Sequence, residues 1–119
     1  MITAYRSLTP QNVDWRWLLQ CEREIPAVIR RQLDRDERVL IDSNPRRIGQ
    51  AMSRNRALLR GSAPAVFCLD DDDELPDGAL EALVGALEDA PGTVFGAWGR
   101  TELLREGRLA PFRHWPREG

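Results

Sequence analysis

The stretch that decides the fold is AVFCLDDDDELPDGALEALV, residues 65–84. Apolar residues Ala65 to Leu69 run directly into four consecutive aspartates, Asp70 to Asp73. An amphipathic helical pattern begins almost at once, near Pro76. Because a nearly continuous apolar run is typical of a strand buried on both faces of a sheet, we predict a strand over residues 63–69. The acidic cluster would then lie at the carboxyl end of that strand.

Strand and helix patterns alternate on both sides of this stretch. We predict further strands over residues 13–20, 38–42 and 93–104, and a short returning strand over 108–112 after a turn at Glu106–Gly107. We predict helices over residues 24–33, 48–60 and 76–90. The apolar residues expected to face inward from these helices are Ile25, Val28, Ile29, Leu33, Ile48, Met52, Leu59, Leu80, Leu83, Val84 and Leu87. This order predicts an α/β fold, with a mostly parallel sheet and flanking helices.

The length and composition bound the class of protein. A chain of 119 residues with 42% hydrophobic and 30% charged residues suits one globular domain, which we place at residues 1–112, with a C-terminal tail over 113–119. No apolar stretch approaches the ~20 residues that a membrane helix needs, so we expect no transmembrane segment. The N-terminus lacks the pattern of a signal peptide, and a cytoplasmic location is therefore the expectation.

Charge and side-chain chemistry exclude several classes of function. The net charge of −2 gives no global positive field, and although all 17 basic residues are arginine, we expect no nucleic-acid partner. The lone histidine, His114, stands in a polar tail, which removes Ser-His and Cys-His nucleophile schemes. Cys21 and Cys68 are far apart in the sequence and are expected to be reduced, largely buried thiols. The tryptophans expected to pack in the core or on strand faces are Trp15, Trp17 and Trp98.

The aspartate cluster has two interpretations. In an extended segment Asp70 and Asp72 would point to one side and Asp71 and Asp73 to the other. Two carboxylates on one side repel each other unless a cation lies between them, and hard oxygen ligands favour Mg²⁺ or Mn²⁺. A D-x-D at a strand end therefore suggests a metal-bridged diphosphate. The alternative is a solvated acidic loop that helps to start the next helix by opposing its dipole.

The surrounding motifs favour the first interpretation. The segment NPRRIGQAMSRNRALLRGSAPAVFCLDDDDELPDGALEALVGAL, residues 44–87, resembles the nucleotide-binding half of family 2 glycosyltransferases, which have the GT-A fold. The shared features are an asparagine–glycine turn, an R-N pair on a helix, an apolar strand, L-D-x-D-D and a Pro-bearing amphipathic helix. DWRWLLQCE (14–22) and TVFGAW (93–98) are similar to neighbouring strands of that family.

The resemblance implies a role for each matching residue. Asp72 would contact the metal, Asp70 the ribose or the waters of the metal, and Asp73 would support both. Arg54 and Asn55 match the R-N pair, with Arg54 facing the nucleotide. Glu22 falls near the position of the family's base-reading aspartate. The implied activity is metal-dependent transfer of a sugar from a nucleoside-diphosphate sugar to an acceptor hydroxyl, with Mg²⁺ or Mn²⁺ as cofactor.

The resemblance also implies that two parts of the family are missing. The chain has no counterpart of the first central strand, so the expected fold is a partial, Rossmann-like GT-A domain truncated at both ends. The N-terminal segment, a second copy in a homo-oligomer or a partner chain would fill the resulting gap in the sheet. No general base can be assigned, and Glu102 is no convincing match. A catalytically inactive fragment that acts as a binding or assembly module is therefore the alternative function. The sugar, the acceptor and the stereochemistry stay open.

Overall fold

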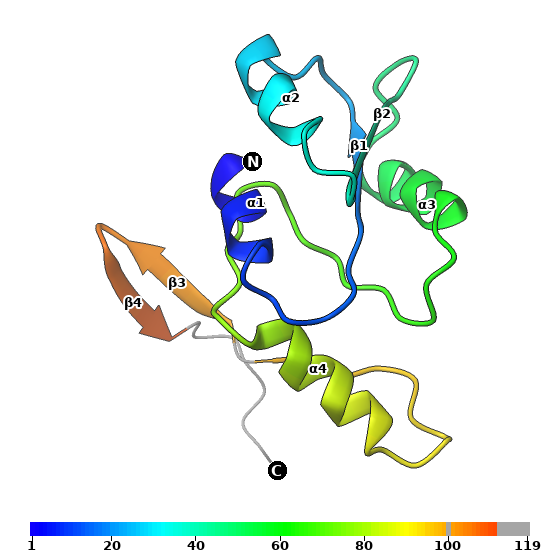
Figure 1. The fold of residues 1–119 in the computed structure, drawn as a ribbon, viewed down its shortest axis with the longest axis vertical. Coiled ribbons are helices and arrows are strands. Elements are labelled where there is room, and N and C mark those ends of the chain that lie inside the picture. Colours follow the sequence, from blue (N-terminus) through cyan, green and yellow to red (C-terminus); the bar gives the residue numbers. More distant parts are fainter. Residues whose placement is uncertain (100, 112–119) are drawn as a thin grey trace. The chain divides into compact units, whose positions relative to one another are not determined.

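The computed structural model describes residues 1–99 and 101–111, and it divides into two compact units, Met1–Gly78 and Ala79–Gly119. Figure 1 shows the order of the elements, with helices α1 to α3 and strands β1 and β2 in the first unit and α4, β3 and β4 in the second. The predicted tail (113–119) and the end of the predicted last strand lie outside the described residues. The proposed domain limits of 1–112 stay a prediction.

The first unit is built on two parallel strands, β1 (Trp17–Cys21) and β2 (Val39–Ser43). Trp17 lies opposite Val39 and Cys21 opposite Ser43. Parallel neighbours need a crossover, and helix α2 (Ala27–Leu33) supplies it. The predicted α/β class is therefore confirmed, and strand β1 begins four residues later than the predicted strand at Val13.

Two further helices belong to this unit. Helix α1 (Ile2–Leu8) precedes β1, and helix α3 (Gln50–Arg60) follows β2 and lies beside β1 (Figure 1). The N-terminal segment therefore forms a helix, and the expectation that this segment, a second copy or a partner chain fills the gap in the sheet stays a prediction. The predicted end of α3 is confirmed, because Gly61 caps it, with its N–H donating to the carbonyl of Leu58.

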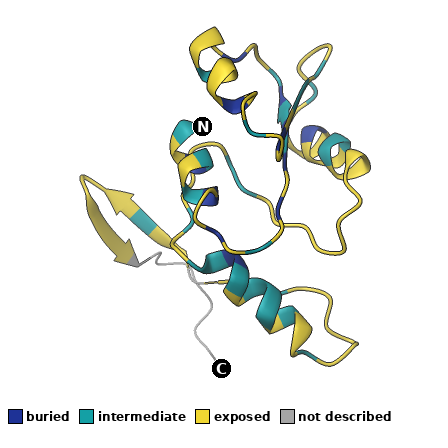
Figure 2. Cartoon of the chain, viewed as in Figure 1, coloured by how far each residue is buried: buried dark blue, intermediate teal, exposed yellow. Residues whose placement is uncertain are grey.

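The core of this unit forms around β1. Alternate residues of the strand, Trp17, Leu19 and Cys21, are buried, while Leu18 and Gln20 are half-buried. The other buried apolar side chains come from strand β2 and from the helices and loops around the sheet (Figure 2): Ala4, Leu8, Trp15, Ile25, Leu33 and Val39. The core positions predicted for Trp15 and Trp17 are confirmed.

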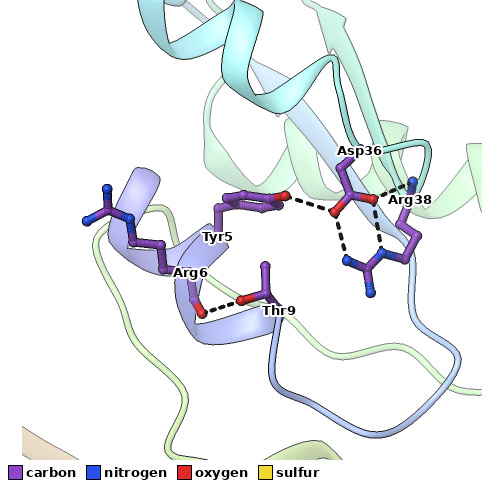
Figure 3. Close-up of polar contacts among 5 residues, drawn as sticks. All are labelled: Tyr5, Arg6, Thr9, Asp36 and Arg38. Carbon is purple, nitrogen blue, oxygen red and sulfur yellow. Dashed lines mark hydrogen bonds and ion pairs between the residues drawn. The ribbon is translucent and has the colours of Figure 1, made fainter.

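A polar cluster joins helix α1 to the loop before β2 (Figure 3). The Tyr5 hydroxyl donates to Asp36 Oδ2 at 2.9 Å, and the Arg38 guanidinium donates to both oxygens of the same carboxylate at 2.9 and 2.8 Å. The Arg38 guanidinium also lies 3.9 Å from the centroid of the Trp15 ring. These contacts satisfy Asp36 from two directions and fix α1 against the start of the sheet.

The predicted strand over residues 63–69 is wrong. The segment has no strand pairing, and Val66 and Phe67 are 64% and 48% exposed. In Figure 2 the coil that follows α3 is correspondingly drawn as exposed. A strand exists only when a neighbour accepts its ladder hydrogen bonds, and the only described strand that pairs with β1 is β2. The prediction that Cys68 is buried is also wrong, because this side chain is exposed. Both cysteines are free thiols, as expected.

Some predicted inward faces are also wrong. Val28 of α2 is 68% exposed, and Met52 and Leu59 of α3 are 54% and 87% exposed. The rotation of α3 is set instead by Ser53, which is buried and accepts a hydrogen bond from Asn44 Nδ2 at 2.8 Å. At about 100° per residue, Met52 and Leu59 lie far from Ser53 around the helix, so they face outward. A polar contact, not apolar periodicity, fixes the orientation of this helix.

The second unit comprises helix α4 (Ala79–Glu88) and the antiparallel hairpin of β3 (Glu102–Arg105) and β4 (Arg108–Pro111). The predicted apolar stripe of α4 is buried or half-buried. The predicted turn at Glu106–Gly107 is confirmed. A strand was predicted over residues 93–104, but residues 93–99 form no strand, and β3 begins only at Glu102. The predicted packing of Trp98 is wrong, because this side chain is 76% exposed.

Membrane-spanning helices were sought along the described residues. None of the helices there combines the length and the apolar character that crossing a bilayer requires.

Candidate functional site

A cavity of about 620 Å³ in the first unit runs along β1 and extends past the carboxyl end of the strand to Pro26. Strand β1 and Glu22 form one side, and residues of α3 and of the turn before it form another. The acidic segment contributes Asp70, Asp71 and Asp72. Ligands of α/β folds commonly bind at the carboxyl ends of parallel strands, so the position of this cavity is chemically informative.

The acidic segment forms a turn and does not continue as an extended strand. The N–H of Asp73 donates to the carbonyl of Asp70 at 3.1 Å, and the backbone nitrogen of Met1 donates to the carbonyl of Asp71. Farther on, the buried side chain of Gln11 donates to the carbonyl of Pro76 at 2.9 Å. The predicted alternation of the aspartates is therefore wrong, because the turn brings Asp71 to the cavity together with its neighbours.

Arg54 and Asp70 form the central ion pair of the site. Arg54 Nη2 lies 2.5 Å from Asp70 Oδ1, and the two side chains are 43% and 42% exposed. Gln50, one helical turn earlier on α3, donates to the same oxygen at 3.5 Å. The Asp70 carboxylate raises the pKa of Arg54, so the guanidinium keeps its charge at every accessible pH.

Glu22 faces the cavity from the end of β1, but its carboxylate is already engaged. Oε1 accepts the N–H of Ile48 at 2.8 Å and that of Gly49 at 2.5 Å. Oε2 lies 3.9 Å from Arg47 Nε. The hydrogen bond from Ile48, followed by those from Gly49 and Ser53 and the charge of Arg47, lowers the pKa of Glu22 against the opposing effect of desolvation.

The structure brings some of the predicted site residues together and not others. Glu22, Arg54, Asp70 and Asp72 line one cavity, whereas Asn55 and Asp73 are exposed and are not among its lining residues. Desolvation, followed by the charges of Asp72 and Asp70, raises the pKa of Asp73. Three polar lining residues of α3 and its preceding turn were not among the predicted site residues: Arg47, Gln50 and Ser53. The i, i+4 spacing of Gln50 and Arg54 was the available signal.

The carboxylates at the cavity limit the kind of divalent-metal site that the protein can form. Among the described residues, no three His, Cys, Asp or Glu side chains converge to hold an ion by themselves. Asp70 and Asp72 nevertheless border the same cavity, and magnesium takes only one or two protein carboxylates where phosphate and water complete its shell. The residues present therefore fit a metal shared with a phosphate-bearing ligand, and not a metal caged by protein alone.

Comparison with known proteins identifies a family for this chain. The family model described as glycosyl transferase family 2 matches residues 22–112, which include Arg54, the acidic segment and the hairpin. No curated protein and no solved structure matches the chain. The parallel pair of strands and the helices are consistent with a partial GT-A fold. Because the match covers more than half of the sequence, the chain belongs to glycosyl transferase family 2.

Proposed function

We propose that the cavity binds the diphosphate of a nucleoside-diphosphate sugar and that the protein transfers the sugar to an acceptor hydroxyl. The observation that carries the proposal is the convergence of Arg54, Asp70 and Asp72 on one cavity at the end of a parallel strand. A planar guanidinium suits a diphosphate because it donates two parallel hydrogen bonds. The family membership supports the same class of donor.

The reaction exchanges one bond for another at the anomeric carbon. The acceptor oxygen forms a bond to that carbon while the bond to the diphosphate oxygen breaks, and the electron pair leaves with the diphosphate. The hydroxyl proton passes to a general base. A Mg²⁺ or Mn²⁺ ion held through Asp72 and Asp70 would supply charge stabilisation for the leaving diphosphate. Arg54 binds and orients the diphosphate, adding positive charge where negative charge develops.

Donor binding requires the central ion pair to open. Arg54 is engaged with Asp70, and the half-exposed positions of both side chains allow exchange with solvent and ligand. A diphosphate offers Arg54 a more highly charged acceptor than one carboxylate, and Asp70 becomes available at the same moment. The ion pair thus holds the Arg54 guanidinium and the Asp70 carboxylate at the site until a ligand separates them.

The binding test uses isothermal titration calorimetry with UDP, GDP and CDP in the presence of Mn²⁺. We expect Asp72→Ala to remove the metal-dependent part of binding and Arg54→Ala to weaken binding ~10- to 100-fold, as loss of a charge-assisted hydrogen bond does. Arg31→Ala, an exposed arginine of α2 outside the cavity lining, is the matched control and should bind as the unmodified protein does. Absence of binding by the unmodified protein with Mn²⁺ would reject the proposal.

A non-catalytic binding or assembly module is the second candidate. Among the described strands β1 pairs with β2 alone, and the apolar segment 63–69 is exposed; both observations favour this candidate, because an open sheet favours association with another chain. A second copy or a partner chain would supply the strand that completes the sheet. Release of nucleoside diphosphate from a panel of nucleotide sugars, measured with and without acceptors, separates the two candidates.

A further inference from the structure

The carboxylate of Glu22 is occupied by hydrogen bonds and an ion pair within the protein, although the residue lines the cavity. Its side chain is 25% exposed, and Oε1 accepts two backbone N–H groups from residues 26 and 27 positions later. The Ser53 hydroxyl donates to the same oxygen at 3.3 Å, so Oε1 accepts from three groups of the protein. Oε2 faces the guanidinium of Arg47, the nearest charged group on the turn.

The two N–H groups belong to the turn that starts α3. Gly49 is the N-cap of this helix, with φ of 86°, and no side chain of the helix itself provides the cap. The first N–H groups of a helix lack internal partners, and a carboxylate at that end also opposes the positive end of the helix dipole. Glu22 therefore fixes the start of α3 from the end of β1.

Helix α3 carries this constraint to the acidic segment. Ser53 Oγ lies 2.9 Å from the carbonyl of Gly49 and 3.3 Å from Glu22 Oε1, so the first turn is held on the cavity side. Gln50 lies at the start of the same turn and Arg54 directly after it. Both of these side chains donate to Asp70. The first turn of α3 thus connects Glu22, which contacts its start, with Asp70, which contacts Gln50 and Arg54.

We propose that Glu22 is a positioning residue that places Arg54 and Gln50 on Asp70 through α3, and that it does not read the nucleobase of the donor. The inference rests on the proposed function for its ligand, but its contacts are independent of that function. Removal of the Glu22 charge loosens the start of α3 and weakens diphosphate binding by the same factor for every base. A base-reading residue would change the order of preference among bases.

The experiment measures the affinity of UDP, GDP and CDP with Mn²⁺ in a double-mutant cycle. We expect Glu22→Gln to weaken all three ~10-fold, about the effect of one charge-assisted hydrogen bond, and to have no further effect in the Arg54→Ala background. Glu37→Gln, an exposed charge outside the cavity lining, should change nothing. A changed order of preference in Glu22→Gln, or a full additive loss in the double variant, would overturn the proposal.

A second variant reaches the same turn without touching the carboxylate. Gly49→Ala meets no atom within 4 Å, but the positive φ strains any residue with a Cβ. We expect it to reproduce the base-independent loss of affinity. A loss caused by Glu22→Gln but absent in Gly49→Ala would contradict positioning through the turn.

Amide NMR without ligand tests the positioning role of Glu22 independently of whether the protein binds a nucleotide. Glu22→Gln should move the amide protons of Ile48 and Gly49 upfield, since a neutral acceptor makes weaker hydrogen bonds. It should also shift the Arg54 side-chain resonance, whereas Asp70→Asn should shift the side-chain resonances of Arg54 and Gln50 and leave the Ile48 and Gly49 amides unchanged. These shifts are read without ligand, so they hold if no nucleotide binds. Unchanged Ile48 and Gly49 amides in Glu22→Gln would overturn the inference.

Discussion

At the scale of single residues, Asp36 shows how much of this small structure depends on one carboxylate. Its side chain is 13% exposed and accepts hydrogen bonds from Tyr5, from the backbone N–H of Arg38 and from two guanidinium nitrogens of Arg38 (Figure 3). The hydrogen bonds from Arg38, followed by that from Tyr5, hold the pKa of Asp36 far below its ordinary value against the effect of desolvation. Desolvation and the same carboxylate raise the pKa of the Tyr5 phenol.

We predict that Asp36→Asn lowers the free energy of unfolding by about 1 to 2 kcal/mol at neutral pH, because the amide is uncharged and offers one acceptor oxygen in place of two, which breaks the two-pronged contact with the Arg38 guanidinium. Chemical denaturation monitored by circular dichroism measures this difference. Asp34→Asn is the matched control. Its ion pair with Arg30 spans 3.5 Å between side chains that are about half exposed, so its loss should cost less than about 0.5 kcal/mol.

The Asp36 contribution has a defined pH dependence. The pKa of this carboxyl is lower in the folded than in the unfolded protein, so its stabilisation is complete above the unfolded value of about 3.9. It is lost as the pH falls below that value towards the folded pKa. The difference between the unmodified protein and Asp36→Asn should therefore be constant above about pH 5 and shrink below pH 4. A difference that grows on acidification would contradict this assignment.

At the scale of elements, the hairpin and the segment 63–69 show opposite outcomes for strand-forming sequences. The β3–β4 hairpin brings its own partner through a two-residue loop in which Glu106 and Gly107 have φ of 49° and 75°. These angles suit the mirror-image turns that match strand twist. Segment 63–69 has a more apolar sequence and no partner, so it stays unpaired and exposed.

We predict that Glu106→Asn stabilises the hairpin by about 0.5 to 1 kcal/mol, because asparagine tolerates positive φ better than glutamate does. The measurement is the population of cross-strand contacts between Leu103 and Ala110, which lie opposite each other, by NMR. Glu106→Val should act in the other direction, because a β-branched residue is strained at positive φ. Equal hairpin populations in both variants would show that the turn does not control this element.

At the scale of the whole molecule, the unfinished sheet of the first unit is the dominant feature. Within the described residues β1 pairs with β2 alone, and its other edge faces the cavity together with the end of segment 63–69. Unpaired strand edges favour association with another strand. The completion of this sheet by a second copy or a partner chain stays a prediction.

We predict that the protein associates with itself as its concentration rises, and that Val66→Pro reduces the association. Val66 is exposed, and proline removes an N–H that a new strand ladder would use. Sedimentation velocity over a concentration series measures this. Phe95→Pro is the matched control, because Phe95 is fully exposed in an unpaired segment of the second unit. A stable monomer over the whole series would contradict the prediction.

The sequence by itself determined the elements whose interactions are local or regular. The spacing of apolar residues predicted α2 and α4, glycines marked the end of α3 and the β-turn, and the order of motifs predicted the family and the cluster of Arg54, Asp70 and Asp72. These features depend on neighbours within a few residues or on a pattern that the family shares.

Only the tertiary structure decided the features that depend on distant partners. Whether residues 63–69 become a strand depends on a pairing strand, which the apolar run cannot supply for itself. The outward faces of Met52 and Leu59 follow from the contact between Asn44 and Ser53. The engagement of Glu22 depends on the Ile48 and Gly49 amides, which come from another part of the chain. Local pattern specifies what a segment can form, whereas the groups that meet it in space decide which hydrogen bonds and burial it obtains.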